Sequence, residues 1–236
     1  MCMGTPSRDT PGPVARRLFF TDFQGNPAEP EDVSIDGLDG GWAEREPDAI
    51  ALLRDSSAHP YDRFLACTAL CAWGSAVGYQ AVIDATANPD SVVWREQSAD
   101  RRFGVDDTFA LLAEDIGRSI DIARQRGTNT ERLAAQAALL GLTGRYFFDR
   151  RLSQSMFESD VRALATTLAA AIDAGIARLR TGEPVGFDLS TQIAGLIGAL
   201  ARVDPARARR DANALLATGP NDRAVRELGD LTDIQS

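Results

Sequence analysis

Residues 60–89 read PYDRFLACTALCAWGSAVGYQAVIDATANP, and this stretch predicts two short helices folded back on each other. Pro60 suits the first turn of a helix, where its missing N–H costs nothing. Residues 64–73 are apolar except for Thr68, which predicts a helix buried on nearly all sides. Gly74 ends that helix, and Asn88 with the following proline ends the second. Because such a hairpin cannot bury its apolar helix alone, we expect helical neighbours on both sides.

The rest of the chain continues the helical pattern. Apolar residues recur at intervals of three and four over 106–126 and again over 160–181, which is typical of amphipathic helices. The sequence therefore predicts an all-α fold of about nine or ten helices, with a single helical-repeat domain over residues 41–236. Residues 1–40 are rich in Pro, Gly and Asp and are expected to form an irregular leader. Within it, residues 16–23 are interpreted as a short strand or docking segment that caps the helical body, with a partner-binding motif as the alternative.

The hairpin at 60–88 resembles a HEAT-type repeat of the armadillo-like class, with its Pro-Tyr-Asp-Arg opening, Ala/Leu-rich first helix and glycine turn. A similar order recurs near the C-terminus, where residues 214–216 (ALL) lead to 220–223 (PNDR), as residues 51–53 (ALL) lead to 60–63 (PYDR). The resemblance covers about residues 42–100; helices 106–126 and 160–181 are longer than HEAT helices. It implies an α-solenoid or α/α superhelix that binds a partner, and a distorted solenoid or a plain bundle also fits.

The charge of the chain limits its partners. The sequence of 236 residues has 34 acidic and 25 basic side chains, a net charge of −9 and a pI near 4.7. This balance disfavours attraction to nucleic-acid phosphates and favours a basic protein partner. All 25 basic residues are arginines, which excludes Schiff-base chemistry and the lysine of a Walker-type phosphate loop.

The cysteine pattern does not suggest a disulfide framework. Cys67 and Cys71 lie four residues apart on the apolar helix, so we expect two buried thiols, with a metal or redox pair as the minor alternative. No metal or cofactor is predicted. There is no 18-residue apolar run and no signal-peptide pattern, so we expect a cytoplasmic protein without a membrane span.

Three features could carry chemistry, and each also has an ordinary explanation. His59 is the only histidine and is expected to be solvated rather than catalytic. Asp107, Glu114 and Asp121 are seven residues apart and could share a helix face as metal ligands, but a solvated face has the same spacing. Residues 145–151 mix aromatic and basic side chains and could contact nucleic acid, which the acidity of the chain opposes.

These observations favour a non-enzymatic helical-repeat module that binds a basic protein, as an adaptor or as an immunity-type protein that masks a bacterial toxin. The partner-binding candidates near the predicted turns are Asp62, Arg63, Glu96, Asp100, Arg101 and Arg102. One alternative is a small-molecule-binding or hydrolytic α/α enzyme whose pocket would be lined by Trp73, Tyr79, Trp94, Phe103 and Phe109. Another is a nucleic-acid-binding HEAT-like protein. The sequence does not predict the oligomeric state.

Overall fold

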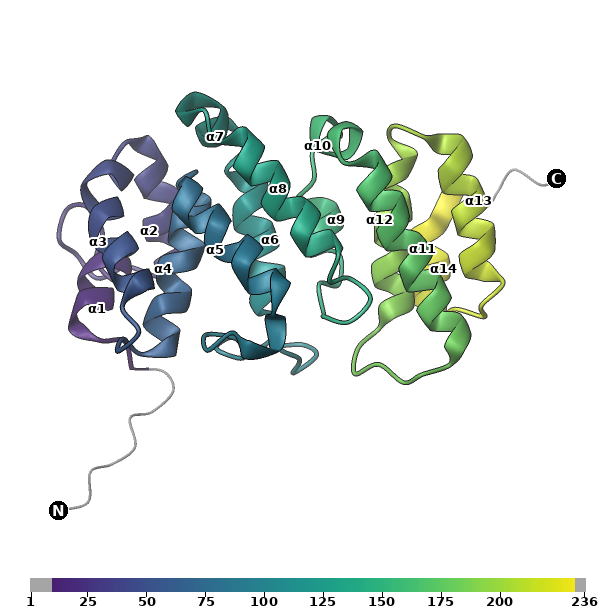
Figure 1. Ribbon diagram of the computed structural model, residues 1–236, viewed down its shortest axis with the longest axis horizontal. Helices are drawn as coiled ribbons and strands as arrows, with labels where there is room; N and C mark the ends of the chain where they lie inside the picture. Colours follow the sequence, from purple (N-terminus) through teal and green to yellow (C-terminus); the bar gives the residue numbers. More distant parts are fainter. Residues whose placement is uncertain (1–9, 232–236) are drawn as a thin grey trace, which may run out of the picture.

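The computed structural model describes residues 10–231, which form a stack of α-helices (Figure 1). The α-helices of this part of the chain are α1 (Pro13–Phe19), α2 (Pro30–Asp36), α3 (Trp42–Arg54), α4 (Pro60–Ala72), α5 (Ala76–Ala87), α6 (Thr108–Arg118), α7 (Ile120–Arg126), α8 (Asn129–Leu140), α9 (Arg151–Gln154), α10 (Glu158–Ala163), α11 (Ala165–Thr181), α12 (Leu189–Ala201), α13 (Pro205–Leu216) and α14 (Asp222–Leu228). Three 3₁₀ turns join them: η1 (Gly37–Asp39), η2 (Pro89–Ser91) and η3 (Gly229–Leu231). No β-strand occurs within residues 10–231, so the all-α prediction is confirmed.

The described residues contain more helices than the nine or ten expected, partly because two long predicted helices are each divided. The segment 106–126 breaks at Ser119 into α6 and α7. The Ser119 hydroxyl donates to the carbonyl of Ile116 at 2.8 Å and lies 2.6 Å from the Tyr79 hydroxyl, and such local side-chain bonds compete with the helical ladder. The segment 160–181 breaks at Leu164, between α10 and α11.

The helices form two layers. In one layer α4, α6, α9, α12 and α14 pack in succession, and α3, α5, α8, α11 and α13 lie against them in the other. Figure 1 shows that the order along the long axis follows the chain, from α1 at one end to α13 and α14 at the other. Grooves open in the second layer between α3 and α5, between α8 and α11, and between α11 and α13.

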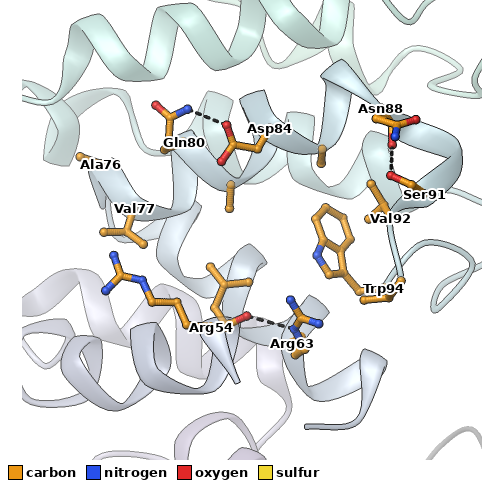
Figure 2. Close-up of a pocket in the computed structure, with 14 residues that line it drawn as sticks. Arg54, Arg63, Ala76, Val77, Gln80, Asp84, Asn88, Ser91, Val92 and Trp94 are labelled. Atoms are coloured by element: carbon orange, nitrogen blue, oxygen red, sulfur yellow. Dashed lines mark hydrogen bonds between the residues drawn. The ribbon is translucent and has the colours of Figure 1, made fainter. Parts of the chain in front are cut away.

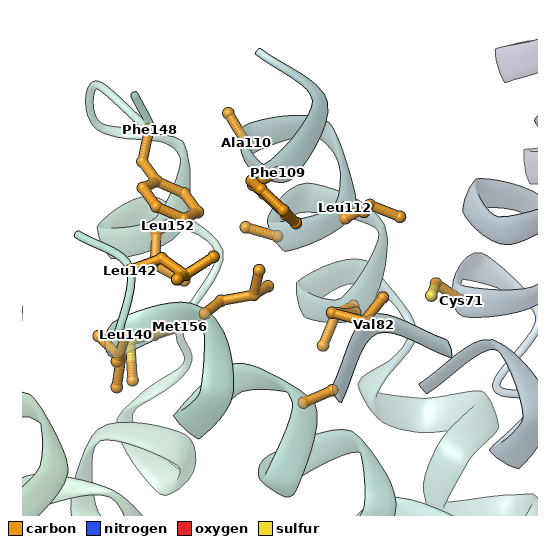
Figure 3. Close-up of a cluster of buried hydrophobic side chains, with 14 of the residues drawn as sticks. Cys71, Val82, Phe109, Ala110, Leu112, Leu140, Leu142, Phe148, Leu152 and Met156 are labelled. Carbon is orange, nitrogen blue, oxygen red and sulfur yellow. The ribbon is translucent and has the colours of Figure 1, made fainter. Parts of the chain in front are cut away.

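The hairpin of residues 60–88 is built as the sequence predicts. Nine of the thirteen residues of α4 are buried, including Cys67 and Cys71, so the expectation of two buried thiols is confirmed. Burial raises the pKa of the Cys71 thiol. On α5, Gly78 allows close approach, because a Cβ there would lie 2.8 Å from the backbone of α4. Further along the stack, apolar side chains of α6, α8 and α9 continue the core between the layers (Figure 3).

The prediction of an irregular leader is wrong for residues 13–36, which contain α1 and α2. Of the two interpretations of residues 16–23, the short strand is wrong, since half of that segment belongs to α1 and only Thr21 makes a single β-bridge, to Pro27. Residues 1–9 lie outside the described part. The pattern of Pro30 followed by two acidic residues is a helix-start signal, so α2 could have been predicted from the sequence.

The leader packs against α3 and α4 through hydrogen bonds from side chains of the body to backbone carbonyls of the leader, which the local sequence does not encode. Arg45 of α3 donates to three carbonyl oxygens in the last turn of α1 and just after it, those of Leu18, Thr21 and Asp22, at 2.6–2.7 Å. The indole N–H of Trp73 donates to the carbonyl of Ser34 at 3.1 Å. These bonds satisfy carbonyls at the ends of α1 and α2 and position both helices on the body.

A buried ion pair joins the middle of the stack. Arg132 of α8 and Asp160 of α10 are both buried and make a two-pronged contact, with one of its hydrogen bonds, from Nη1 to Oδ2, at 3.1 Å. The Arg132 Nε–H also donates to Asn129 at 2.9 Å, and Asp160 accepts the N–H of Phe157 at 3.3 Å. Because both charged groups are satisfied, this pair ties α8 to α10.

A buried amide makes a second link in the middle of the stack, between α12 and the segment that precedes α9. The Oε1 of Gln192, on α12, accepts the N–H of Phe148 at 2.7 Å. Its Nε2 donates to the carbonyls of Thr143 and Tyr146 at 2.6 and 3.1 Å. All three partners belong to the segment between α8 and α9, so one side chain fixes this connection to α12.

The ion pair gives a prediction for stability. We expect Arg132→Met to lower the free energy of unfolding by about 3–5 kcal/mol, because it leaves the Asp160 carboxylate buried without its partner. Adding Asp160→Asn removes that charge, so the double variant should be more stable than Arg132→Met alone. Urea denaturation followed by circular dichroism measures all three.

The control is Arg124→Met, which removes a half-exposed arginine paired with Asp121 at 3.6 Å and should cost less than about 1 kcal/mol. Equal losses for Arg124→Met and Arg132→Met, or a double variant no more stable than Arg132→Met, would contradict the role assigned to this pair.

Candidate binding surfaces

The structure corrects one predicted partner-binding residue. Asp62 was expected at the surface, but it is 4% exposed. Its carboxylate accepts the backbone N–H of Gly12 at 3.1 and 3.2 Å, so it holds the start of α1 against the start of α4. The neighbouring Arg63 stays partly exposed, donates its Nε–H to the carbonyl of Leu53 at 3.0 Å, and lines the groove between α3 and α5.

The other four predicted residues lie in the segment between α5 and α6. Asp100 opens a tight turn, in which its Oδ1 accepts the N–H groups of Arg102 and Phe103 and its backbone bonds to Val105. Its carboxylate is therefore engaged within the turn. Arg101 and Arg102 are exposed at the tip. Glu96 is exposed outside the turn and pairs with the neighbouring arginine at 3.0 Å.

Arg151 of α9 brings together carboxylates that the sequence placed apart. It lies 3.0 Å from Asp100, 3.2 Å from Asp107 and 3.6 Å from Glu114. Burial raises the pKa of Asp107 and of Glu114, and Arg151 opposes both shifts. Since Asp107 is buried and Asp121 is exposed, the expected shared face of Asp107, Glu114 and Asp121 does not form.

Beside this cluster lies a small polar pocket of about 260 Å³, which Arg102 and Phe103 also line. Phe103 contacts the guanidinium groups of Arg102 and Arg223. Their Cζ atoms lie 5.3 and 5.4 Å from the centroid of the Phe103 ring. The arginines of the pocket are largely paired, Arg223 with Asp149 at 2.7 Å among them. The arrangement consequently works as a network of ion pairs across α9 and α14.

The aromatic residues proposed as pocket walls are mainly core residues. Trp73, Tyr79 and Phe109 are at most 2% exposed. Trp94 is 5% exposed, stacks on Phe64 and lines the groove between α3 and α5. The prediction of a single pocket lined by all five aromatic residues is therefore wrong.

Two remaining candidates have local roles. His59 is partly buried, and its Nδ1 accepts the N–H of Tyr61 at 3.3 Å, so it caps α4 rather than being freely solvated. In the basic-aromatic segment 145–151, Phe147 and Phe148 are buried. Arg145 and Tyr146 contact Asp90 at 3.2 and 2.6 Å.

The groove between α3 and α5 has a volume of about 640 Å³ and largely apolar walls (Figure 2). Its apolar lining residues are Leu53, Ala76, Val77, Ala81, Ala85, Val92, Val93 and Trp94. Arg54 and Arg63 form the edge on the side of α3 and α4, and Gln80 and Asp84 lie on the opposite side, on α5. Such a concave surface, apolar with a few charged groups, is typical of a ligand site.

A second surface is acidic. Residues 18–44 contain seven carboxylate side chains and no basic residue, and this signal was available in the sequence. We call the exposed part of it the acidic α2 surface, formed by Glu29, Glu31, Asp32, Ile35, Asp36 and Asp39. Ile35 is 46% exposed among these carboxylates. Within the described residues, only Glu31 of this set makes an ion pair, with Arg118 at 3.4 Å.

Arg118 connects the acidic α2 surface to a further carboxylate on α6. It lies 3.9 Å from Asp115, whose side chain is 15% exposed. Burial raises the pKa of Asp115 to about 7; Arg118 lowers it, and Glu114 and Glu31 raise it further. The buried Cys71 thiol of α4 also faces this carboxyl.

Comparison of the chain with protein-family models, with curated proteins and with solved structures gave no match. Within residues 10–231 no group of three or more His, Cys, Asp or Glu side chains is placed to hold a metal ion. In the same part of the chain, no helix has the length and apolar character needed to cross a membrane.

Asp115 gives a prediction for pH dependence. Its folded-state pKa lies above the unfolded value, so the ionised form is penalised in the folded state, and the contribution of this carboxyl to the free energy of unfolding should fall as pH rises from about 4 to 7. Asp115→Asn removes this titration. We expect the free energy of unfolding of the variant, relative to that of wild type, to increase by on the order of 1 kcal/mol as pH rises from 5 to 8. Urea denaturation at each pH measures it.

Asp121→Asn, which changes a carboxylate whose side chain is 93% exposed, is the control and should show the wild-type pH dependence. If wild type and Asp115→Asn differ by a constant amount from pH 5 to pH 8, the carboxyl does not titrate in this range and the prediction is wrong.

Proposed function

We propose that this chain is a non-enzymatic helical-repeat protein that binds a basic protein partner through the acidic α2 surface. The observation that carries the proposal is the location of the charge. Residues 18–44 hold seven carboxylates without a basic residue, whereas the rest of the chain holds 27 acidic and 25 basic residues. The net charge of −9 therefore comes mainly from one segment at one end of the stack.

The geometry of the acidic α2 surface supports this proposal. Glu29, Asp32, Asp36 and Asp39 make no ion pair within residues 10–231, so their charges remain available to a partner. Ile35, exposed on the same helix, supplies an apolar contact within the patch. An apolar contact supplies affinity, and nearby unpaired charges increase the association rate with an oppositely charged partner.

The two-layer order of helices along the chain supports a HEAT-like α-solenoid as the architecture behind this function. In such a stack the helices at each end have neighbours on one side only, which leaves a face at each end. The most concrete form of the proposal is an immunity-type protein that masks a basic toxin in the cytoplasm. An adaptor that holds a basic subunit of a larger complex uses the same surface.

The test uses charge reversal. The variant Asp36→Lys/Asp39→Lys changes the acidic α2 surface, and Asp121→Lys/Glu183→Lys makes the same change in net charge at exposed positions elsewhere. Tagged wild type and both variants serve as bait in extracts of the native host, washed at about 50 and 500 mM salt, with bound proteins identified by mass spectrometry. We expect one stoichiometric basic protein, retained by wild type and the control and reduced at least tenfold for the α2 variant and at high salt.

If all three proteins recover the same partner equally well, the interface does not include the acidic α2 surface and this assignment is wrong. Absence of any stoichiometric protein at either salt concentration would contradict the protein-binding proposal. Ile35→Ala separates the two contributions, because it should increase the dissociation rate and leave the salt dependence unchanged.

A further inference from the structure

Two basic residues, Arg54 and Arg63, and one acidic residue, Asp84, line the groove between α3 and α5, so its local charge is positive, opposite to that of the whole chain. Arg54 and Arg63 lie along one edge, and neither makes an ion pair within residues 10–231. Arg54 is exposed, and Arg63 uses only its Nε–H, on the carbonyl of Leu53. The nearby Asp55 carboxylate accepts from the backbone and hydroxyl of Ser57 at 2.8 and 2.6 Å. Guanidinium donors therefore remain free at this edge.

The opposite side of the groove offers few free polar groups. Gln80 donates to Asp84 at 2.8 Å along α5, and the Ser91 hydroxyl donates to the backbone carbonyl of Asn88 at 2.9 Å (Figure 2). Between these pairs, the walls consist of small and branched apolar side chains with the ring of Trp94 at one end. An occupant of this region needs apolar surface and gains little from donors or acceptors along its length.

We propose that this groove binds a long-chain carboxylic acid, with its carboxylate at Arg54 and its alkyl chain along α5 toward Trp94. The volume of about 640 Å³ is within the range of small-molecule sites. The carboxylate accepts hydrogen bonds from the free guanidinium of Arg54, and the alkyl chain removes the apolar walls from water. An extended peptide fits less well, because its backbone N–H and C=O groups would lack partners against these walls.

The experiment is titration calorimetry of the full chain with dodecanoate, below its critical micelle concentration. Dodecyltrimethylammonium has the same tail and a positive head, and general attraction to a protein of net charge −9 would favour it. We expect saturable one-to-one binding of dodecanoate, at least tenfold tighter than binding of the cation. Hexanoate should bind at least tenfold more weakly, because its shorter tail buries less apolar surface in the groove.

Two variants locate the site. Arg54→Glu changes an exposed side chain and should weaken dodecanoate at least tenfold, whereas Arg180→Glu, at an exposed position on α11, should not. Ala81→Trp fills the groove from α5 and should abolish binding while circular dichroism stays unchanged. Equal affinity for the cation, or unchanged binding in Arg54→Glu and Ala81→Trp, overturns the proposal. The acidic α2 variant should bind dodecanoate like wild type, so this test is independent of the proposed protein partner.

Discussion

The buried pair of Arg132 and Asp160 is the interaction on which the continuity of the stack depends. Moving two charges out of water carries a large desolvation penalty, which is offset only when geometry and hydrogen bonding are good. Here the guanidinium and the carboxylate meet through two hydrogen bonds, and each has a further partner at the end of its own helix. The pair thus fixes where α10 lies against α8, and α10 leads directly into α11.

The two layers of the stack differ in how closely neighbouring helices within each layer pack. Small residues let helices approach: a Cβ at Gly78 would collide with α4, and a Cβ at Gly175 would lie 2.2 Å from Ile193. The layer of α4, α6, α9, α12 and α14 is continuous, whereas the other layer is open between α3 and α5 and on both sides of α11. The grooves therefore arise from unequal spacing of the helices in one layer.

Sequence periodicity predicted the features that depend on local patterns. The apolar run of α4, the Gly74 turn and the buried thiols follow from residue types within 30 positions. Prediction from local patterns failed where a contact with a residue far away in the sequence determines the local structure. Asp62 looked like a turn carboxylate, and its partner is Gly12, fifty residues earlier. Likewise, the break at Ser119 involves the Tyr79 hydroxyl, forty residues away. The acidic segment could have been found in the sequence, but the net charge of the whole chain does not indicate where the carboxylates are concentrated.

A net charge describes the field at a distance, whereas a binding site responds to the groups within a few ångströms. In this chain the two differ. The far field is negative and originates mainly in the segment that includes the acidic α2 surface, where it can guide a basic partner to one end of the stack. At the groove between α3 and α5, two unpaired arginines reverse the sign over a short range. The two proposals use these two regions separately: a basic partner at the acidic α2 surface, and an anion at the arginine edge of the groove.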